Sequence, residues 1–116
     1  MKIQVLEKQV AAAGEIVRLV EELDYRYAKL TGVALLDNVG VDCTLLTSNV
    51  DGAELFPDNF EVGFLQTNAF VPPDKRFFSI QPRDAKGKKI NIDFKDGSSA
   101  NGYPYVLRIY LRLSND

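Results

Sequence analysis

The last part of the chain alternates between apolar and polar positions with a period of two. One parity between residues 103 and 113 holds Tyr103, Tyr105, Leu107, Ile109, Leu111 and Leu113, and the other holds Val106, Arg108, Tyr110 and Arg112. Successive side chains of a β-strand point to opposite faces, whereas a helix would spread these residues around its circumference. The pattern therefore predicts a strand with one buried face and one solvated face.

Several shorter segments alternate in the same way and are separated by turn residues. Residues 90–95 alternate before the turn signal Asp96-Gly97, and residues 60–64 alternate so that Phe60 and Phe64 are predicted to point inward. Two short apolar stretches, 43–47 and 53–56, flank turn residues and indicate a hairpin. Such short, regularly spaced strands are typical of an antiparallel β-sandwich or jelly roll. We expect an all-β fold forming a single domain over residues 1–116.

Residues 15–30 fit two patterns. A helical stripe would contain Ile16, Leu19, Val20, Leu23, Tyr27 and Leu30, and a strand would place Val17, Leu19, Leu23, Tyr25 and Tyr27 on one face. The alternation of Tyr25 and Tyr27 and the β-rich remainder of the chain favour strands. The alternative is an α+β fold in which one helix near residues 15–30 packs on a sheet.

The composition excludes most catalytic and metal-binding chemistry. The 116 residues are 46% hydrophobic and 26% charged, and they include no His, no Trp and one Cys. Without His there is no imidazole base, no Ser–His–Asp triad and no His-containing zinc site. Cys43 has no disulfide partner in the chain and is expected to be a buried apolar side chain. The carboxylates show neither the pairing of a glycosidase nor the spacing of an EF-hand. We predict no catalytic residue, no cofactor and no metal site.

Charge is unevenly distributed along the chain, whose net charge is −2. Residues 1–63 contain five basic and eleven acidic side chains, whereas residues 64–116 contain nine basic and five acidic ones. In a compact domain the two halves could simply face each other. Alternatively they could form two opposite electrostatic poles, which suit head-to-tail contacts between copies. The basic run at 83–89 lacks a phosphate-binding pattern, and the chain as a whole is mildly acidic, so no nucleic-acid partner is expected.

The beginning of the sequence predicts where the chain is made. Charged residues interrupt the apolar positions of residues 1–8, so no signal-peptide pattern is present. No segment approaches the roughly 20 apolar residues of a membrane span. We expect a chain made in the cytoplasm, with no membrane partner.

Two groups of residues are candidates for contacts with other proteins. Phe70, Val71, Pro72 and Pro73 lie in a turn-rich stretch where proline stiffens the chain and prevents a regular central strand. Arg108, Tyr110 and Arg112 share the predicted solvated face of the last strand. Tyr and Arg are enriched in protein interfaces. These seven residues form the candidate interface.

The order of strand and turn phrases between about residues 30 and 113 resembles small β-sandwich proteins of bacteriophage virions, which decorate capsids or are otherwise virion-associated. The phrases are Gly52-Ala53-Glu54-Leu55-Phe56-Pro57, Asn59-Phe60-Glu61-Val62, Val71-Pro72-Pro73 with Arg76-Phe77-Phe78, and Gly102-Tyr103-Pro104-Tyr105 leading into Arg108-Ile109-Tyr110-Leu111.

This resemblance implies a non-enzymatic structural or assembly protein located in a virion. Such a subunit would act through contacts with itself, for example as a trimer or another closed homo-oligomer, and with capsid or other structural proteins. The alternative function is a carbohydrate- or ligand-binding β-sandwich module, with exposed aromatic rings beside acidic and amide side chains.

Overall fold

The computed structural model describes residues 1–36, 38–40, 42–68, 70–72, 75–100 and 102–115, which form two β-sheets and no α-helix. Sheet A contains β1 (Lys2–Val10), β3 (Lys29–Leu36), β7 (Gln66–Thr67), β8 (Phe78–Asp84) and β10 (Tyr105–Ser114). Sheet B contains β2 (Ile16–Glu22), β4 (Thr44–Val50), β5 (Ala53–Glu54), β6 (Phe60–Glu61) and β9 (Lys89–Lys95). A 3₁₀ helix, η1 (Val62–Phe64), follows β6. The predicted all-β sandwich is confirmed.

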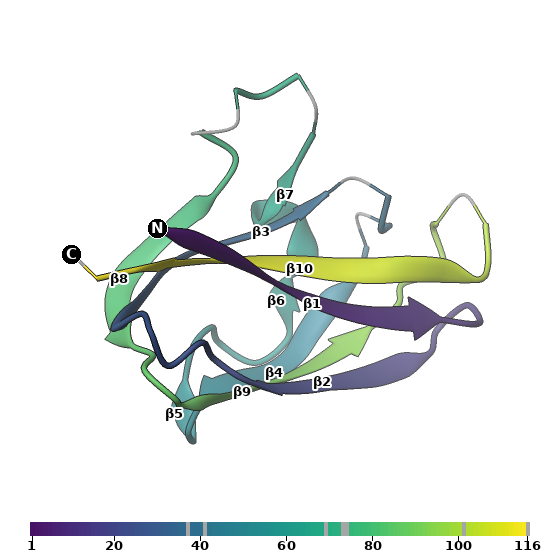
Figure 1. Ribbon diagram of the computed structural model, residues 1–116. Helices are drawn as coiled ribbons and strands as arrows, with labels where there is room; N and C mark the ends of the chain where they lie inside the picture. Colours follow the sequence, from purple (N-terminus) through teal and green to yellow (C-terminus); the bar gives the residue numbers. More distant parts are fainter. Residues whose placement is uncertain (37, 41, 69, 73–74, 101, 116) are drawn as a thin grey trace.

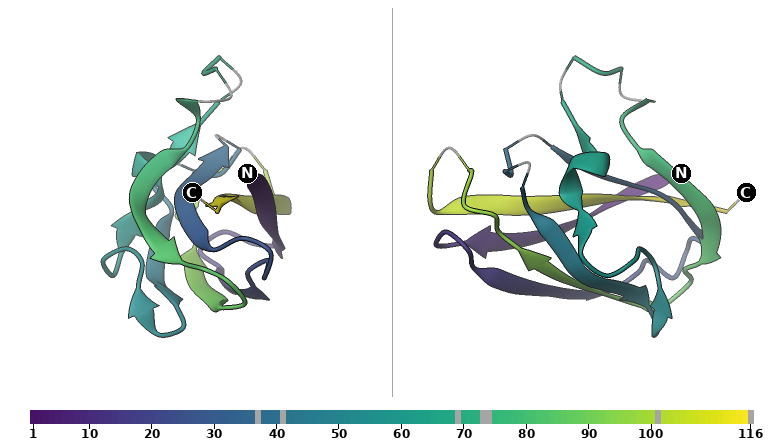
Figure 2. Two further views of the ribbon diagram at one scale, coloured as in Figure 1. Left: turned by 60° about the vertical axis from the view of Figure 1, so that its left-hand side comes forward. Right: turned by 180° about the vertical axis from the view of Figure 1, so that it is seen from behind.

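The two sheets have the strand order of a jelly roll. In sheet A the order is β1-β10-β3-β7, with β8 also paired to β3, and in sheet B it is β2-β9-β4-β5, with β6 also paired to β4. The chain therefore crosses between the sheets repeatedly, and strands from its two ends become neighbours, as in jelly rolls. The described pairs are antiparallel except for the short parallel pair of β3 with β7. Figure 1 shows β1 and β10 in one layer and β2, β9 and β4 in the other, and Figure 2 shows the same layers from two further directions.

The core lies between the sheets and follows from the alternation in the sequence. On β10, Leu107, Ile109, Leu111 and Leu113 are buried and face Ile90, Ile92 and Phe94 of β9 across a single hydrophobic cluster. Strand β3 is buried on most of its length because it is paired on both sides, by β10 and by β7 and β8. The predicted hairpin is also present, since β4 pairs with β5 across the turn at Asp51 and Gly52.

The segment at 15–30 contains a strand, so the alternative with a helix there is wrong. Strand β2 pairs with β9 so that Val17 lies opposite Phe94 and Leu19 opposite Ile92, and both β2 side chains are buried. The other parity, Ile16 and Val20, is exposed. The apolar residues that suggested a helical stripe thus divide between the two faces of an edge strand.

The prediction that Phe64 points inward is wrong. Strand β6 ends at Glu61, and the amide of Leu65 donates to the carbonyl oxygen of Val62 at 2.8 Å, which closes the 3₁₀ turn. In such a turn residues three apart share a side, so Val62 and Leu65 are buried while Phe64 is 66% exposed. Phe60 keeps its predicted position against the core.

Candidate functional site

The outer face of sheet A carries the predicted ladder of the last strand. The register pairs Ile3 with Arg112, Val5 with Tyr110 and Glu7 with Arg108, so the six side chains form three rows across β1 and β10. Arg108 Nε donates to Glu7 Oε2 at 3.0 Å. Ile3 and Val5 are exposed although they are large and apolar. The face therefore combines apolar surface with arginine and tyrosine, the composition of protein interfaces.

This face contains a concave apolar site, here called the sheet A pocket. It has a volume of about 220 Å³ and is lined by Ile3, Ala34, Leu36, Thr67, Arg76, Phe77 and Tyr110. Its residues come from β1, β3, β7 and β10 and from the segment before β8. Neighbouring strands supply the floor because Tyr110 pairs with Ala34, and Leu36 pairs with Thr67. The volume suits one apolar side chain of a partner.

The hydroxyl of Thr67 is the one buried side-chain polar atom in the described part of the chain that has no hydrogen-bond partner. Thr67 lies on the wall of the sheet A pocket. A buried hydroxyl without a partner costs roughly 1–3 kcal/mol. A group that enters the pocket and hydrogen-bonds to this hydroxyl would recover that cost.

Arg112 is held in place at the side of the face. Its Nε donates to Thr31 Oγ1 at 3.0 Å, and its Nη2 donates to the carbonyl oxygen of Thr31 at 3.0 Å and to Ser79 Oγ at 3.2 Å. The guanidinium also lies 5.3 Å from the centre of the Phe77 ring, within cation–π distance. Gly32 makes this position accessible, because a Cβ there would be 3.0 Å from the guanidinium carbon. The positive charge is thus fixed before any partner arrives.

The predicted loop lies next to the same pocket. Phe70 is 96% exposed, Pro72 is exposed and Val71 is half-buried, whereas Pro73 lies outside the described residues. The backbone is ordered by Asn68, whose side-chain oxygen accepts from the Phe70 amide at 2.9 Å. The loop between β7 and β8 projects from the body of the sandwich (Figure 1). Its two ends contribute Thr67 and Phe77 to the sheet A pocket. Val71 lines a depression together with Thr67, Arg76 and Phe77 of the pocket wall, and Tyr110 lines the pocket itself. One residue from each candidate group, about 40 positions apart in the sequence, therefore lies at this site.

The sequence analysis missed the first strand as part of this site. Ile3 and Val5 alternate with Lys2 and Gln4, which is a strand signal, but it does not reveal that the apolar parity faces outward. Leu6 and Val10, of the opposite parity, are buried. The remaining pocket residues, Ala34, Leu36 and Thr67, carry no sequence signal that separates them from the core.

A second feature missed from the sequence is a buried carboxylate at the end of the sandwich. Asp96 is 1% exposed and accepts hydrogen bonds from the hydroxyls of Tyr103, at 2.6 Å, and Tyr105, at 2.7 Å. The backbone amides of Gly14 and Ser98 donate to it at 3.0 and 2.9 Å. The sequence indicates only that Asp96 begins a turn, not that its carboxylate is buried.

The hydrogen bonds determine the charge state of this cluster. Burial raises the pKa of Asp96, but the bonds from both tyrosines and both amides outweigh burial and lower the pKa below its ordinary value. The hydrogen bond to Asp96, together with burial, raises the pKa of Tyr103 to about 12. Asp96 is thus a fixed, fully bonded anion, the opposite of the protonated carboxyl that a general acid requires. Its role is to hold chain segments together.

Cys43 belongs to the same end of the molecule and is fully buried, as predicted. Burial raises the pKa of the Cys43 thiol, and Sγ lies 3.6 Å from Asp96 Oδ1, to which it donates. A protonated, buried thiol beside a carboxylate is a poor nucleophile.

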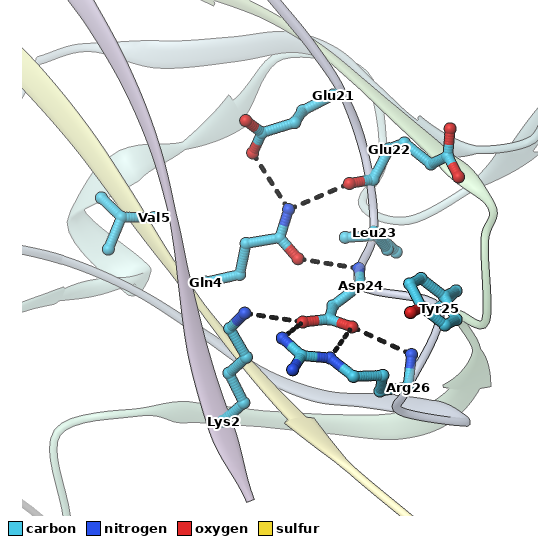
Figure 3. A pocket seen from close by; sticks show the side chains of 9 residues that line it. All are labelled: Lys2, Gln4, Val5, Glu21, Glu22, Leu23, Asp24, Tyr25 and Arg26. Atoms are coloured by element: carbon cyan, nitrogen blue, oxygen red, sulfur yellow. Dashed lines mark hydrogen bonds and ion pairs between the residues drawn. The ribbon is translucent and has the colours of Figure 1, made fainter.

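A polar pocket lies where the first two strands meet at the other end of the sandwich (Figure 3). The side-chain nitrogen of Gln4, Nε2, donates to Glu21 Oε2 and to the carbonyl oxygen of Glu22, both at 3.0 Å. Asp24 accepts from Lys2 Nζ at 2.6 Å and from the Arg26 guanidinium at 2.8 and 3.0 Å. These groups bind one another and connect β1 of sheet A to the end of β2 of sheet B. The exposed ring of Tyr25 lies beside them.

No family model, curated protein or solved structure matches the chain. Among the described residues there is no group of three or more His, Cys, Asp or Glu side chains arranged to hold a metal ion. The described part of the chain also contains no helix long and apolar enough to cross a membrane.

Proposed function

We propose that this chain is a non-enzymatic assembly subunit that acts by binding other proteins through the outer face of sheet A and the adjacent Phe70 loop. The observation that carries the proposal is the sheet A pocket, an apolar concave site on an exposed sheet face. Soluble proteins usually bury such sites or use them for contacts. Tyr110 lines the pocket, and Arg108 and Arg112 lie on the same face of β10, so residue types that dominate binding energies at interfaces are present at this site.

The proposal extends to the kind of particle in which the subunit acts. The resemblance to phage virion accessory proteins and the jelly-roll topology both suggest a virion, since jelly rolls are common in viral capsids. The same topology occurs in lectins and other ligand-binding proteins, so the fold alone does not decide the function. The resemblance therefore supports the virion location, and the exposed contact surface of sheet A supports the assembly role.

The alternative function, a carbohydrate- or ligand-binding module, would use the polar pocket in Figure 3. Tyr25 offers a ring there, and Gln4 and Asp24 offer polar atoms. Those atoms already bond to Glu21, Lys2 and Arg26, so a sugar would have to displace protein contacts. We therefore rank this alternative second.

The proposal is tested by recovering the tagged chain from its native source and measuring what accompanies it in fixed proportion by quantitative mass spectrometry. We expect a stoichiometric protein assembly with the wild-type chain. The variant Ile3→Glu should lose it, because a carboxylate would enter the apolar pocket. The variant Val20→Glu is the matched control, since Val20 is 48% exposed on sheet B and Ile3 is 45% exposed on sheet A.

Recovery of the wild-type chain without any stoichiometric partner would contradict the proposal, and so would equal recovery with both variants. A glycan array provides the opposing measurement. Micromolar binding of a sugar that Tyr25→Ala abolishes would support the alternative function instead.

A further inference from the structure

The strands of the two sheets carry opposite net charge. The strands of sheet A contain six basic and two acidic side chains, whereas those of sheet B contain three basic and five acidic ones. On the outer face of sheet A, Arg108 and Arg112 outnumber Glu7, and Arg76 adds a further positive charge at the sheet A pocket. A partner for this pocket should therefore be acidic.

The chain itself contains an acidic surface, here called the acidic edge and formed by Glu54, Asp58, Glu61 and Phe64. Glu54 lies on β5, Asp58 between β5 and β6, Glu61 on β6 and Phe64 on η1, at the edge of sheet B beyond β4. Residues 30–74 include no Lys or Arg, and the three carboxylates are exposed and take part in none of the ion pairs of the described residues. Phe64 protrudes beside them, 66% exposed, with its ring 5.6 Å from that of Phe60.

We propose that the sheet A pocket of one copy binds the acidic edge of a second copy, with the Phe64 side chain in the pocket. This inference rests on the proposed function and names the partner. The pocket supplies apolar walls for the ring, and the fixed guanidinium of Arg112 and the nearby Arg108 face Glu54, Asp58 and Glu61. The exposed ring and the three carboxylates, which form no ion pair among the described residues, thus meet an apolar pocket and positive charge on the other copy.

Charge also decides against the symmetrical arrangement. Two sheet A faces packed on each other would bring four outward arginines, Arg108 and Arg112 from each copy, into one interface. Repulsion between these like charges would weaken binding, so the sheet A pocket pairs with the acidic edge instead of with a second sheet A face. A contact between two different surfaces is heterologous and repeats from copy to copy.

The acidic edge and the sheet A pocket lie close together on the molecule. A shallow depression of about 270 Å³ is lined by Phe64 of the acidic edge and by Thr67, Arg76 and Phe77 of the pocket wall. The two surfaces are thus neighbours on one side of the molecule. A heterologous contact of this kind forms a ring where the rotation between copies closes, and an open filament where it does not.

Two variants test the pairing, each disabling one surface. The face variant is Ile3→Glu, with Arg108→Glu as a second version, and the edge variant combines Glu61→Lys with Phe64→Ser. All four positions are exposed, so circular dichroism should show the wild-type fold. Val20→Glu again serves as the control. Mass is measured by light scattering after size exclusion, over a range of concentrations.

We expect the wild-type chain and Val20→Glu to form oligomers, and each of the two surface variants to weaken association at least tenfold, to the 13.0 kDa monomer. A 1:1 mixture of the face variant and the edge variant should then form a dimer of twice that mass. In this pair the intact acidic edge of one partner meets the intact pocket of the other, and no further copy can add.

Three results would overturn the inference: a mixture that stays monomeric, an edge variant that associates like the wild type, or a wild-type chain that is monomeric at every concentration. The last result leaves the proposed function standing if the chain still recovers a stoichiometric assembly that depends on Ile3. If the chain neither associates with itself nor recovers a stoichiometric assembly, the proposed function is wrong as well.

Discussion

Asp96 shows how one residue can organise a whole end of the sandwich. The carboxylate is buried and collects hydrogen bonds from the side chains of Tyr103 and Tyr105 and from two turns. A buried charge is favourable only when such partners compensate for the water it has lost. The cluster is therefore sensitive to the loss of the negative charge.

The variant Asp96→Asn tests this sensitivity. We expect a loss of about 2–4 kcal/mol in the free energy of unfolding at pH 7, because the amide places donors against donors. Urea unfolding followed by fluorescence of the tyrosines measures it. The loss should shrink as the pH falls below the unfolded value of about 3.9, because protonation of the unfolded chain then removes the stabilisation that the wild-type carboxylate provides. Asp58→Asn, at an exposed turn position, is the control and should change little.

Cys43 gives a second prediction at the residue scale. A thiol reagent such as dithionitrobenzoate should not react with the native protein on the time scale of minutes and should react stoichiometrically in urea. Burial and the raised pKa both suppress the thiolate that such reagents require. Rapid labelling of the native protein would show that this end of the sandwich opens readily.

Among the strands, the sequence predicts which face is buried but not what covers the other face. The alternation in β10 correctly assigns Ile109 and Leu111 to the core and Arg108 and Tyr110 to the surface. Period-two alternation reports the pleat of a strand, which depends on that strand alone. The sheet A pocket was not predictable, because it depends on β1, β3 and β7 lying beside β10 in a jelly-roll order that no local pattern specifies.

Local patterns fail where the backbone changes type without a change in composition. Phe60, Val62 and Phe64 continue the alternation of β6, yet the chain enters η1 after Glu61 and Phe64 rotates outward. Likewise, the sequence Asp96-Gly97 indicates only a turn. It gives no sign that the hydroxyls of Tyr103 and Tyr105, seven and nine positions later, donate hydrogen bonds to the Asp96 carboxylate. The first difference arises from a local change of backbone conformation, and the second from contacts between segments.

A pair of substitutions on β10 tests the assignment of its faces. Ile109→Asp should abolish cooperative folding, costing more than about 4 kcal/mol, because an unpaired carboxylate would lie in the core. The double variant Arg108→Glu with Tyr110→Ala should keep the fold and weaken association. Thermal melts followed by circular dichroism report the first effect, and light scattering reports the second. A near wild-type melt for Ile109→Asp would mean that the faces are reversed.

For the whole molecule, the ionisable groups predict a plateau of stability around neutral pH. Hydrogen bonds from Arg26 and Lys2 hold the pKa of Asp24 below its usual range, the bond from Lys29 does the same for the pKa of Asp84, and that from Arg18 for the pKa of Asp93. The chain has no His, which is the side chain that ordinarily titrates between pH 5 and 8.

Proton linkage determines how the free energy of unfolding changes on the acidic and the alkaline side of this plateau. A carboxyl whose pKa is lower in the folded protein stabilises it fully above the unfolded value of about 3.9, and this contribution is lost as the pH falls through the folded pKa. Cys43, Tyr103 and Tyr105 have raised pKa values in the folded protein, so their contribution is complete below the unfolded values of about 8.5 and 10 and is lost as the pH rises.

We therefore expect a free energy of unfolding that is nearly constant from about pH 5 to 8 and declines on both sides. Urea unfolding across the pH range measures it, and Asp96→Asn should flatten the acidic limb. A steep slope between pH 6 and 7 would contradict the prediction, because the chain contains no His.

The hydrogen bonds from Gly14 and Ser98 to Asp96 have a further consequence. These amides belong to the turn between β1 and β2 and to the connection between β9 and β10, which lie together at one end of the molecule (Figure 1). Turn amides usually exchange their hydrogens for deuterium within the least protected class. Here the amides of Gly14 and Ser98 should exchange slowly and at similar rates, because one carboxylate must release them together. Two segments that are far apart in the sequence would then open as a single unit.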